Sequence, residues 1–258
     1  MTPESRATLP PRHRQVSAVG LAGDARGVAR EGVADAVALA VRSAGTLHDW
    51  AGLQPDRRAL HGRGVAWAVR LADGTPVVVR RNRHGGLLAR FTGDRFLPPT
   101  RAPRELATAV RLAAAGVPTP ELVAYMVYPA GPLLRRVDVV TREVAESADL
   151  PAALDRWPGH RTALLAATAR LVSQLTRAGA RHADLNVKNI LLTMDGETAL
   201  AHVLDVDRVV FGGADDPAVL RANLARLVRS VQRWHERRGP LLDEGELQLL
   251  ERLAREDA

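Results

Sequence analysis

The sequence predicts an α+β protein with a strand-rich first half and a mostly helical second half. Two strand-like runs follow residue 64, and the dipeptide Asp73-Gly74 between them predicts a hairpin. Helical periodicity dominates after residue 146, where one further hairpin is predicted around Asp195-Gly196. Strands followed by helices are typical of an α+β fold, here with two lobes.

The first half begins with an extension, 1–60, that contains a single helical pattern at about 32–44. We expect the Pro- and Arg-rich segment before that helix to be poorly ordered. The first lobe, 61–145, starts with the strands "VAWAVRL" and "VVVRR", and the glycine-rich tract "HGGLLARFTGDRF" after them reads as an exposed loop. A helix at 101–116 then precedes two more strands, "ELVAYMVYPAG" and "LLRRVDVVTREV".

The second lobe, 146–258, is predicted to be helical around one polar hairpin. Its helices are expected at 146–159, 160–179, 216–239 and 243–256. The polar stretch "RHADLNVKN" lies between the second of these helices and the hairpin. Loops held by buried elements in this way are common sites of chemistry.

The composition excludes several classes of function. Cysteine is absent, which removes disulfides, zinc thiolates and cysteine nucleophiles. No apolar run approaches the roughly 18 to 20 residues of a membrane helix, and the first thirty residues do not resemble a signal peptide. With 258 residues, 46% of them hydrophobic, the chain can bury a substantial core. We therefore expect a soluble protein of the cytoplasm.

The formal net charge of +7 predicts a surface that attracts polyanions. Aromatic residues make up 3% of the chain, which argues against nucleic-acid binding by base stacking. An ordinary solvated arginine surface would account for the charge equally well. Lys188 is the only lysine, so tasks that usually need a lysine must fall to arginine.

The stretch "HADLNVKN" matches the pattern H-R-D-L-x-x-x-N of the protein-kinase catalytic loop. His182, Asp184 and Asn189 are in register, and Ala183 replaces the arginine. In that loop the aspartate reaches the hydroxyl to be phosphorylated, and the asparagine five residues later holds magnesium on the phosphates. A polar turn before a strand would look much the same, so the loop alone does not decide the function.

A second acidic ligand for magnesium is expected on the far arm of the hairpin that follows this loop. Asp205 in "LDVDR" stands at that place, after the apolar residues "HVL". Asn189 and Asp205 would then form the metal site at the mouth of one hairpin. Taken alone, Asp205 could also be a turn residue at a strand end.

The first hairpin offers candidates for binding the phosphates. Gly62 and Gly64 before Val65 resemble a shortened glycine-rich loop, where backbone amides can approach a phosphate. Arg80 ends the second strand, where kinases place the lysine that grips the α- and β-phosphates. Its partner should be Glu105, the sole carboxylate on the following helix. The alternative is an ordinary surface arginine and glutamate.

Together these motifs resemble the lipopolysaccharide kinase family, in particular its 3-deoxy-D-manno-octulosonic acid (Kdo) kinases. The resemblance is carried by "GRGVAW", "VVVRRNRHGGLLAR", "RAPREL", "HADLNVKNILL" with "LDVDR", and "ANLARLVRS". These stretches span about two-thirds of the chain. Two features depart from the pattern: Val206 replaces an aromatic residue between two aspartates, and Asn82 stands where histidine is common.

The resemblance implies a bilobal protein-kinase-like fold, with a small β-rich first lobe and a shortened helical second lobe. It also implies ATP and Mg²⁺ as cofactors, and Asp184 as the group that orients and deprotonates a sugar hydroxyl. The acceptor would be an acidic, lipid-linked sugar. The protein would then sit as a peripheral protein at the anionic inner face of the inner membrane, with Arg83, Arg90, Arg95 and the C-terminal stretch "RWHERRG" as plausible contacts.

Two other readings remain open. The same fold could act on another acceptor, such as a heptose of the lipopolysaccharide core, a small molecule or a protein. Alternatively, the chain could be a pseudokinase scaffold without turnover, although Asp184, Asn189 and Asp205 are all present. The sequence does not indicate which hydroxyl is phosphorylated or what oligomer forms.

Overall fold

A computed structural model describes residues 9–20, 23–61, 64–83 and 93–258. The chain divides into two compact units, Met1–Ala107 with Glu121–Glu143 and Thr108–Pro120 with Val144–Ala258. Gly62 and most of the glycine-rich tract, at 84–92, lie outside the described residues.

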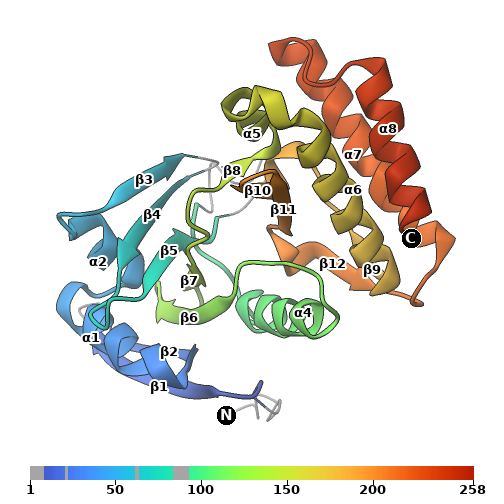
Figure 1. Ribbon diagram of the computed structural model, residues 1–258. Helices are drawn as coiled ribbons and strands as arrows, with labels where there is room; N and C mark the ends of the chain where they lie inside the picture. The colour runs from blue at the N-terminus through green and yellow to red at the C-terminus, as the bar shows by residue number, and fades with distance from the viewer. Residues whose placement is uncertain (1–8, 21–22, 62–63, 84–92) are drawn as a thin grey trace. The chain divides into compact units, whose positions relative to one another are not determined.

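The first unit is built on an antiparallel sheet in which seven strands are described (Figure 1). In chain order they are β1 (His13–Gly20), β2 (Gly23–Arg30), β3 (Arg58–His61), β4 (Val65–Arg70), β5 (Pro76–Arg81), β6 (Leu122–Pro129) and β7 (Arg135–Arg142). In space they run in the order β1-β2-β6-β7-β5-β4-β3. The predicted turn at Asp73-Gly74 joins β4 to β5. Gly74 has a φ of +83°, and Asp73 accepts a hydrogen bond from the Thr75 amide at 3.0 Å.

The amino-terminal extension contains more structure than its sequence pattern indicated. Besides the expected helix, α1 (Ala34–Ala44), it forms β1, β2 and a second helix, α2 (Leu47–Leu53). The expectation of one helix preceded by a poorly ordered segment is wrong for residues 13–20 and 23–30, because β1 pairs with β2, and β2 pairs with β6 and joins the same sheet. The apolar residues of β1 are few and small, and their partners lie far along the chain, so local periodicity is weak.

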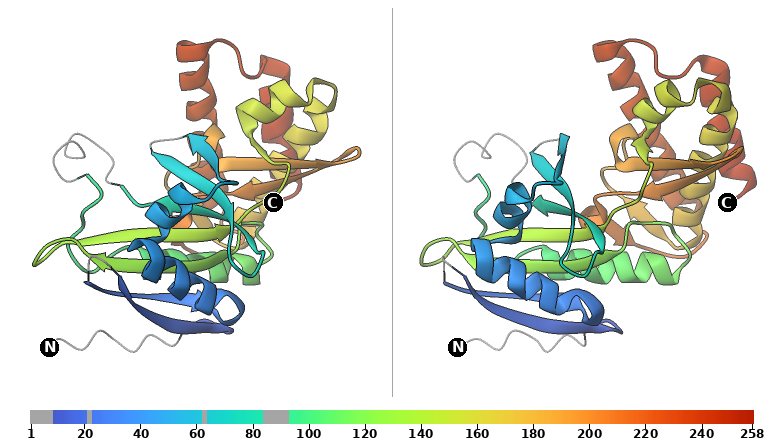
Figure 2. Two further views of the ribbon diagram at one scale, coloured as in Figure 1. Left: turned by 90° about the vertical axis from the view of Figure 1, so that its left-hand side faces the viewer. Right: turned by 60° about the vertical axis from the view of Figure 1, so that its left-hand side comes forward.

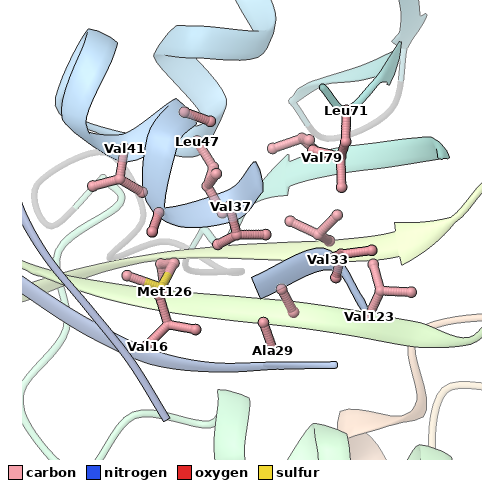
Figure 3. Close-up of a cluster of buried hydrophobic side chains, with 14 of the residues drawn as sticks. Val16, Ala29, Val33, Val37, Val41, Leu47, Leu71, Val79, Val123 and Met126 are labelled. Carbon is pink, nitrogen blue, oxygen red and sulfur yellow. The ribbon is translucent and has the colours of Figure 1, made fainter. Parts of the chain in front are cut away.

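Helices α1 and α2 cover one face of this sheet (Figure 3). Val37 and Val41 of α1 and Leu47 of α2 are fully buried against Val79 of β5 and Met126 of β6. The aliphatic side chains of the extension therefore form one core with the strands that the sequence assigned to the first lobe.

Strand β5 directs its two final arginines to opposite faces of the sheet. Arg80 faces the side where α4 (Ala102–Ala114) supplies Glu105. Arg81 faces α2: it donates to Asp138 at 3.1 Å, to Thr46 at 2.6 Å and to Asp49 at 3.1 Å. Burial works against the charge on Arg81, but Asp138 and Asp49 outweigh it and raise the pKa of the guanidinium.

Asp138 also holds the first turn of α2. Its Oδ2 accepts the backbone amide of His48 at 2.9 Å, and the Tyr128 hydroxyl accepts the amide of Leu47 at 3.0 Å. These amides have no partner within the helix, so their satisfaction by side chains of β6 and β7 fixes α2 on the sheet.

The second unit is mostly helical. Helix α4 begins in the first unit and ends in the second, and the other helices are α5 (Leu150–Arg156), α6 (Arg161–Arg177), α7 (Pro217–Arg238) and α8 (Glu244–Glu256). Two small antiparallel sheets accompany them. One contains β8 (Ala148–Asp149), β10 (Ile190–Asp195) and β11 (Thr198–Val203), and the other contains β9 (Ala180–His182) and β12 (Val209–Phe211).

The predicted fold class is confirmed: the chain is α+β, with a sheet-rich first unit and a mostly helical second unit. The boundaries predicted at residues 60 and 145 stay predictions. Within the described ranges, no helix has both the length and the apolar character needed to cross a membrane.

We predict that Arg81→Met destabilises the protein by about 3–5 kcal/mol, because it strands the fully buried Asp138 without its cation. The measurement is the free energy of unfolding from urea denaturation. Arg58→Met is the matched control, since Arg58 pairs with Glu143 while its side chain is 62% exposed. This control should cost less than about 1 kcal/mol. Equal losses in the two variants would contradict the prediction.

Candidate active site

The backbone of the polar loop after β9 is held by its own side chains. The carbonyl oxygen of Asp184 accepts hydrogen bonds from the amide groups of Asn186 at 3.0 Å and Asn189 at 2.9 Å. The Asn186 side chain also accepts the backbone amide of Lys188 at 3.0 Å, which starts the 3-10 turn Val187–Asn189. Asp184 and Asn189 are therefore brought together by direct contact.

His182 braces this loop from inside. Its ring is fully buried, with Nε2 bonded to the Leu204 carbonyl at 2.9 Å and Nδ1 accepting the Asp184 amide at 3.2 Å. Burial lowers the pKa of His182, against the influence of the Leu204 carbonyl and the nearby aspartates. A neutral ring with its proton on Nε2 satisfies both contacts, so His182 is suited to a structural role and not to that of a base.

Asn189 directly precedes β10 and Asp205 follows β11 by two residues, so both stand at the open end of the β10–β11 hairpin, where Ile190 pairs with Val203. The Leu204 amide donates to the Asn189 carbonyl at 2.9 Å. Asp205 is the next residue in the chain after Leu204. Asp205 lies in the left-handed region, with φ +54° and ψ +48°, a conformation that non-glycine residues seldom adopt. Such strain tends to cluster at functional sites.

The two residues fit a magnesium ion. The Asn189 nitrogen donates to Asp184, which leaves its amide oxygen facing elsewhere, and Asp205 supplies a carboxylate. Oxygen ligands from one or two residues, completed by water and phosphate oxygens, are what Mg²⁺ prefers. In the described part of the chain no group of three or more His, Asp or Glu side chains could hold a metal by itself.

Helix α7 anchors the loop through residues for which the sequence suggested no role. The fully buried side chain of Asn223 accepts the His182 amide at 2.9 Å and donates to the Ala180 carbonyl at 3.0 Å. Ser230 accepts the Val187 amide at 3.1 Å. The signal was available in "ANLARLVRS": Asn223 stands one helical turn from each of the buried residues Val219 and Leu227, and a polar residue on a buried stripe needs a partner.

Lys188 ties the loop to two further elements. Its ammonium group lies 2.7 Å from Asp149, whose other oxygen accepts the Ala152 amide and so caps α5. The same ammonium lies 5.2 Å from the ring centre of Trp234 on α7. The only lysine of the sequence thus lies between the loop, α5 and α7.

The first unit contains the other predicted site residues. Arg80 donates to Glu105 and, at 2.7 Å, to Asn82, so the predicted ion pair is present. Glu105 is almost fully buried, and such burial is favourable for a carboxylate only when it is paired. Gly64 lies against Arg83: a Cβ atom at Gly64 would come within 3.0 Å of the Arg83 Nε atom. Gly62 lies outside the described residues.

The structure thus brings together two groups of predicted residues, each within its own unit. Arg80 and Glu105 form one group, and Asp184, Asn189 and Asp205 form the other through the backbone contacts of the loop and hairpin. The second group can orient the Asp184 carboxylate, which could accept a proton, beside two side chains that offer oxygen ligands to a cation.

The chain is similar in sequence to proteins of one known family. Residues 50–252 match the Lipopolysaccharide kinase (Kdo/WaaP) family. A 3-deoxy-D-manno-octulosonic acid kinase of Actinobacillus succinogenes is 31% identical over 196 residues, which cover 72% of this chain and 78% of the relative. A protein of the same name from Vibrio parahaemolyticus is 27% identical over 195 residues, which cover 71% of this chain and 79% of the relative. Another, from Xylella fastidiosa, is 33% identical over 182 residues, which cover 66% of this chain and 67% of the relative.

Among solved structures, "WaaP in complex with acyl carrier protein" is similar, with a TM-score of 0.44 and 24% identity. The similarity covers 78% of this chain and 88% of that one. The family match spans more than half of the chain, and a relative above 30% identity is covered over most of its length. The chain therefore belongs to the lipopolysaccharide kinase (Kdo/WaaP) family and is a phosphotransferase that acts on an alcohol group.

Proposed function

We propose that this protein transfers the γ-phosphoryl group of ATP to a hydroxyl of the Kdo sugar in the lipopolysaccharide inner core. The observation that supports this most directly is the hydrogen bond from the Asn189 amide to the Asp184 carbonyl at 2.9 Å, which couples the proposed base to the proposed metal ligand. The family match and the names of the relatives support the sugar acceptor.

In the proposed reaction Asp184 accepts the proton of the acceptor hydroxyl as its oxygen attacks the γ-phosphorus. The new P–O bond forms while the bond from the γ-phosphorus to the bridging oxygen of ADP breaks. The Asp184 backbone is held on both sides, by His182 at its amide and by the two asparagines at its carbonyl. Such positioning supplies most of the catalysis in phosphoryl transfer.

Mg²⁺, held by Asn189 and Asp205, would neutralise charge that develops on the phosphate oxygens. Arg80, oriented by Glu105, would grip the α- and β-phosphates in place of the usual lysine. Gly64 and Gly62 would let backbone amides approach the phosphates without a side chain in between. We place the reaction at the cytoplasmic side of the inner membrane, where the lipid-linked acceptor would be reached.

Asp184→Asn is expected to lower kcat by roughly 10²–10⁴-fold, since the amide cannot accept the proton. The protein is incubated with ATP, Mg²⁺ and Kdo-containing lipid A precursors, and the product is scored by mass for one added phosphoryl group. Asp195→Asn, at the exposed hairpin turn, is the matched control and should keep full activity.

No phosphorylated Kdo product from the wild type, or equal product from Asp184→Asn, would overturn the proposed function. Product that appears only with heptose-containing acceptors would move the proposal to the heptose kinase alternative.

Asn223→Ala should lower both stability and turnover, because it leaves the buried His182 amide and Ala180 carbonyl without partners. We expect a loss of about 2–3 kcal/mol in the free energy of unfolding, and a lower kcat at nearly constant KM for ATP. Ser230→Ala removes one contact and should show a smaller change of the same kind. Unchanged kcat in a folded Asn223→Ala protein would contradict this role for α7.

Lys188→Met should lower kcat by about fivefold, as expected when a half-exposed ion pair and a cation–π contact that steady the loop are lost. Lys188→Arg should retain most of the activity, because both contacts need only a cation. Arg252→Met, which removes an exposed pair on α8, is the control. If Lys188→Arg were as impaired as Lys188→Met, the ammonium group itself would be required and the positioning role would be wrong.

A further inference from the structure

One end of the first-unit sheet collects exposed apolar side chains. Val19, at the end of β1, is 71% exposed, Leu133 in the β6–β7 turn is 72% exposed, and Leu97 is 67% exposed. Large aliphatic side chains are seldom exposed to this degree in a group, and such groups mark interaction surfaces.

These three residues come from separate segments that the fold brings to the same end. Gly23, where β2 begins, lies near Pro129, where β6 ends: a Cβ atom at Gly23 would be 3.6 Å from the Pro129 ring. Figure 2 shows the β6–β7 turn projecting at this end, with the end of β1 and the beginning of β2 beside it in both views. Phe96 pairs with Arg135 through two backbone hydrogen bonds of 2.7 Å, which places Leu97 beside the start of β7.

The same end of the sheet is positively charged. Arginines at this end include Arg83, Arg95, Arg135 and Arg136, and acids there include Asp24, Asp94 and Asp138, the last of which is paired with Arg81. Asp94 is already neutralised by Arg136, which donates to it at 2.5 Å. The guanidinium of Arg135 bonds only a neutral group in the described residues, the Leu134 carbonyl at 2.8 Å, and so keeps its full charge for an external anion.

We propose that this sheet end, made of Val19, Leu97 and Leu133 with Arg95 and Arg135, is the surface by which the protein docks on an anionic lipid bilayer. The leucines and the valine enter the interfacial region, and the arginines lie among the phosphate groups. Apolar side chains next to cations match a bilayer, which offers hydrocarbon below a layer of negative charge.

The position of this surface in the sheet suits the proposed reaction, and the docking proposal rests on a lipid-linked acceptor. Because the strands are antiparallel, the ends of β1, β3, β5 and β6 and the beginnings of β2, β4 and β7 share one edge. Gly64, next to the start of β4, is therefore at the same end as the docking surface. A bilayer bound there would present its headgroups near the loop proposed to bind the transferred phosphate.

The test is co-sedimentation of the full chain with vesicles of phosphatidylcholine alone or mixed with phosphatidylglycerol. The wild type should bind the mixed vesicles more tightly at low salt. Leu97→Ser and Leu133→Ser should each weaken this binding by about tenfold. Arg95→Gln and Arg135→Gln should each weaken it by about fivefold, and should leave binding to the neutral vesicles unchanged.

Leu53→Ser is the matched control, because Leu53 is 73% exposed but precedes the start of β3, and Arg58 at that start pairs with Ala68 whereas His61 at the other end of β3 pairs with Val65. It should bind as the wild type does. Equal binding of the wild type to both vesicles, or no effect of the two leucine variants, or an equal effect of Leu53→Ser, would overturn the proposal.

Phosphoryl transfer to a soluble Kdo acceptor without acyl chains separates docking from catalysis. The leucine variants should keep wild-type turnover on this acceptor, and a loss of that turnover would show that the substitutions act on the enzyme and not on docking. If the wild type docks on anionic vesicles but phosphorylates no Kdo acceptor, the proposed function fails while the docking surface stands.

Discussion

The arrangement of the proposed catalytic loop depends on one buried amide, the side chain of Asn223. It bridges the Ala180 carbonyl and the His182 amide, and so fixes the strand that delivers the loop. His182 then bonds both the Asp184 amide and the Leu204 carbonyl, and the Leu204 amide returns to Asn189. Each contact satisfies a backbone group that burial would otherwise leave unpaired, which makes the loop rigid without any ligand.

In the first unit, a single strand, β5, supplies a charged side chain to each face of the sheet. Strand β5 ends in two consecutive arginines whose side chains point to opposite faces, so Arg80 meets Glu105 on one side and Arg81 meets Asp138 on the other. The side bearing Arg81 is covered by α1 and α2 of the amino-terminal extension. The extension thus covers the ion pair of Arg81 with Asp138, and Arg81 is the neighbour of the proposed phosphate-binding Arg80 in β5. A shift of this strand would therefore move Arg80 as well.

The fold shows where the arginines that give the protein its positive charge lie. Many arginines take part in ion pairs, as Arg81, Arg136 and Arg161 do. Exposed apolar side chains and several arginines instead gather at the end of the sheet that contains Gly64. A solvated arginine surface therefore explains part of the net charge, and the proposed docking surface gives another part a specific partner.

The sequence by itself determined the order of most helices and strands, the kinase-like loop and the pairing of Arg80 with Glu105. These depend on local periodicity, turn residues and motif spacing, all of which are written within short stretches of chain. Only the tertiary structure decided the place of β1 and β2, because β2 finds its partner in a strand far along the chain. It also decided the roles of Asn223, Lys188 and Arg81, since a polar side chain acquires a role from the groups that burial brings to it, and those come from distant segments.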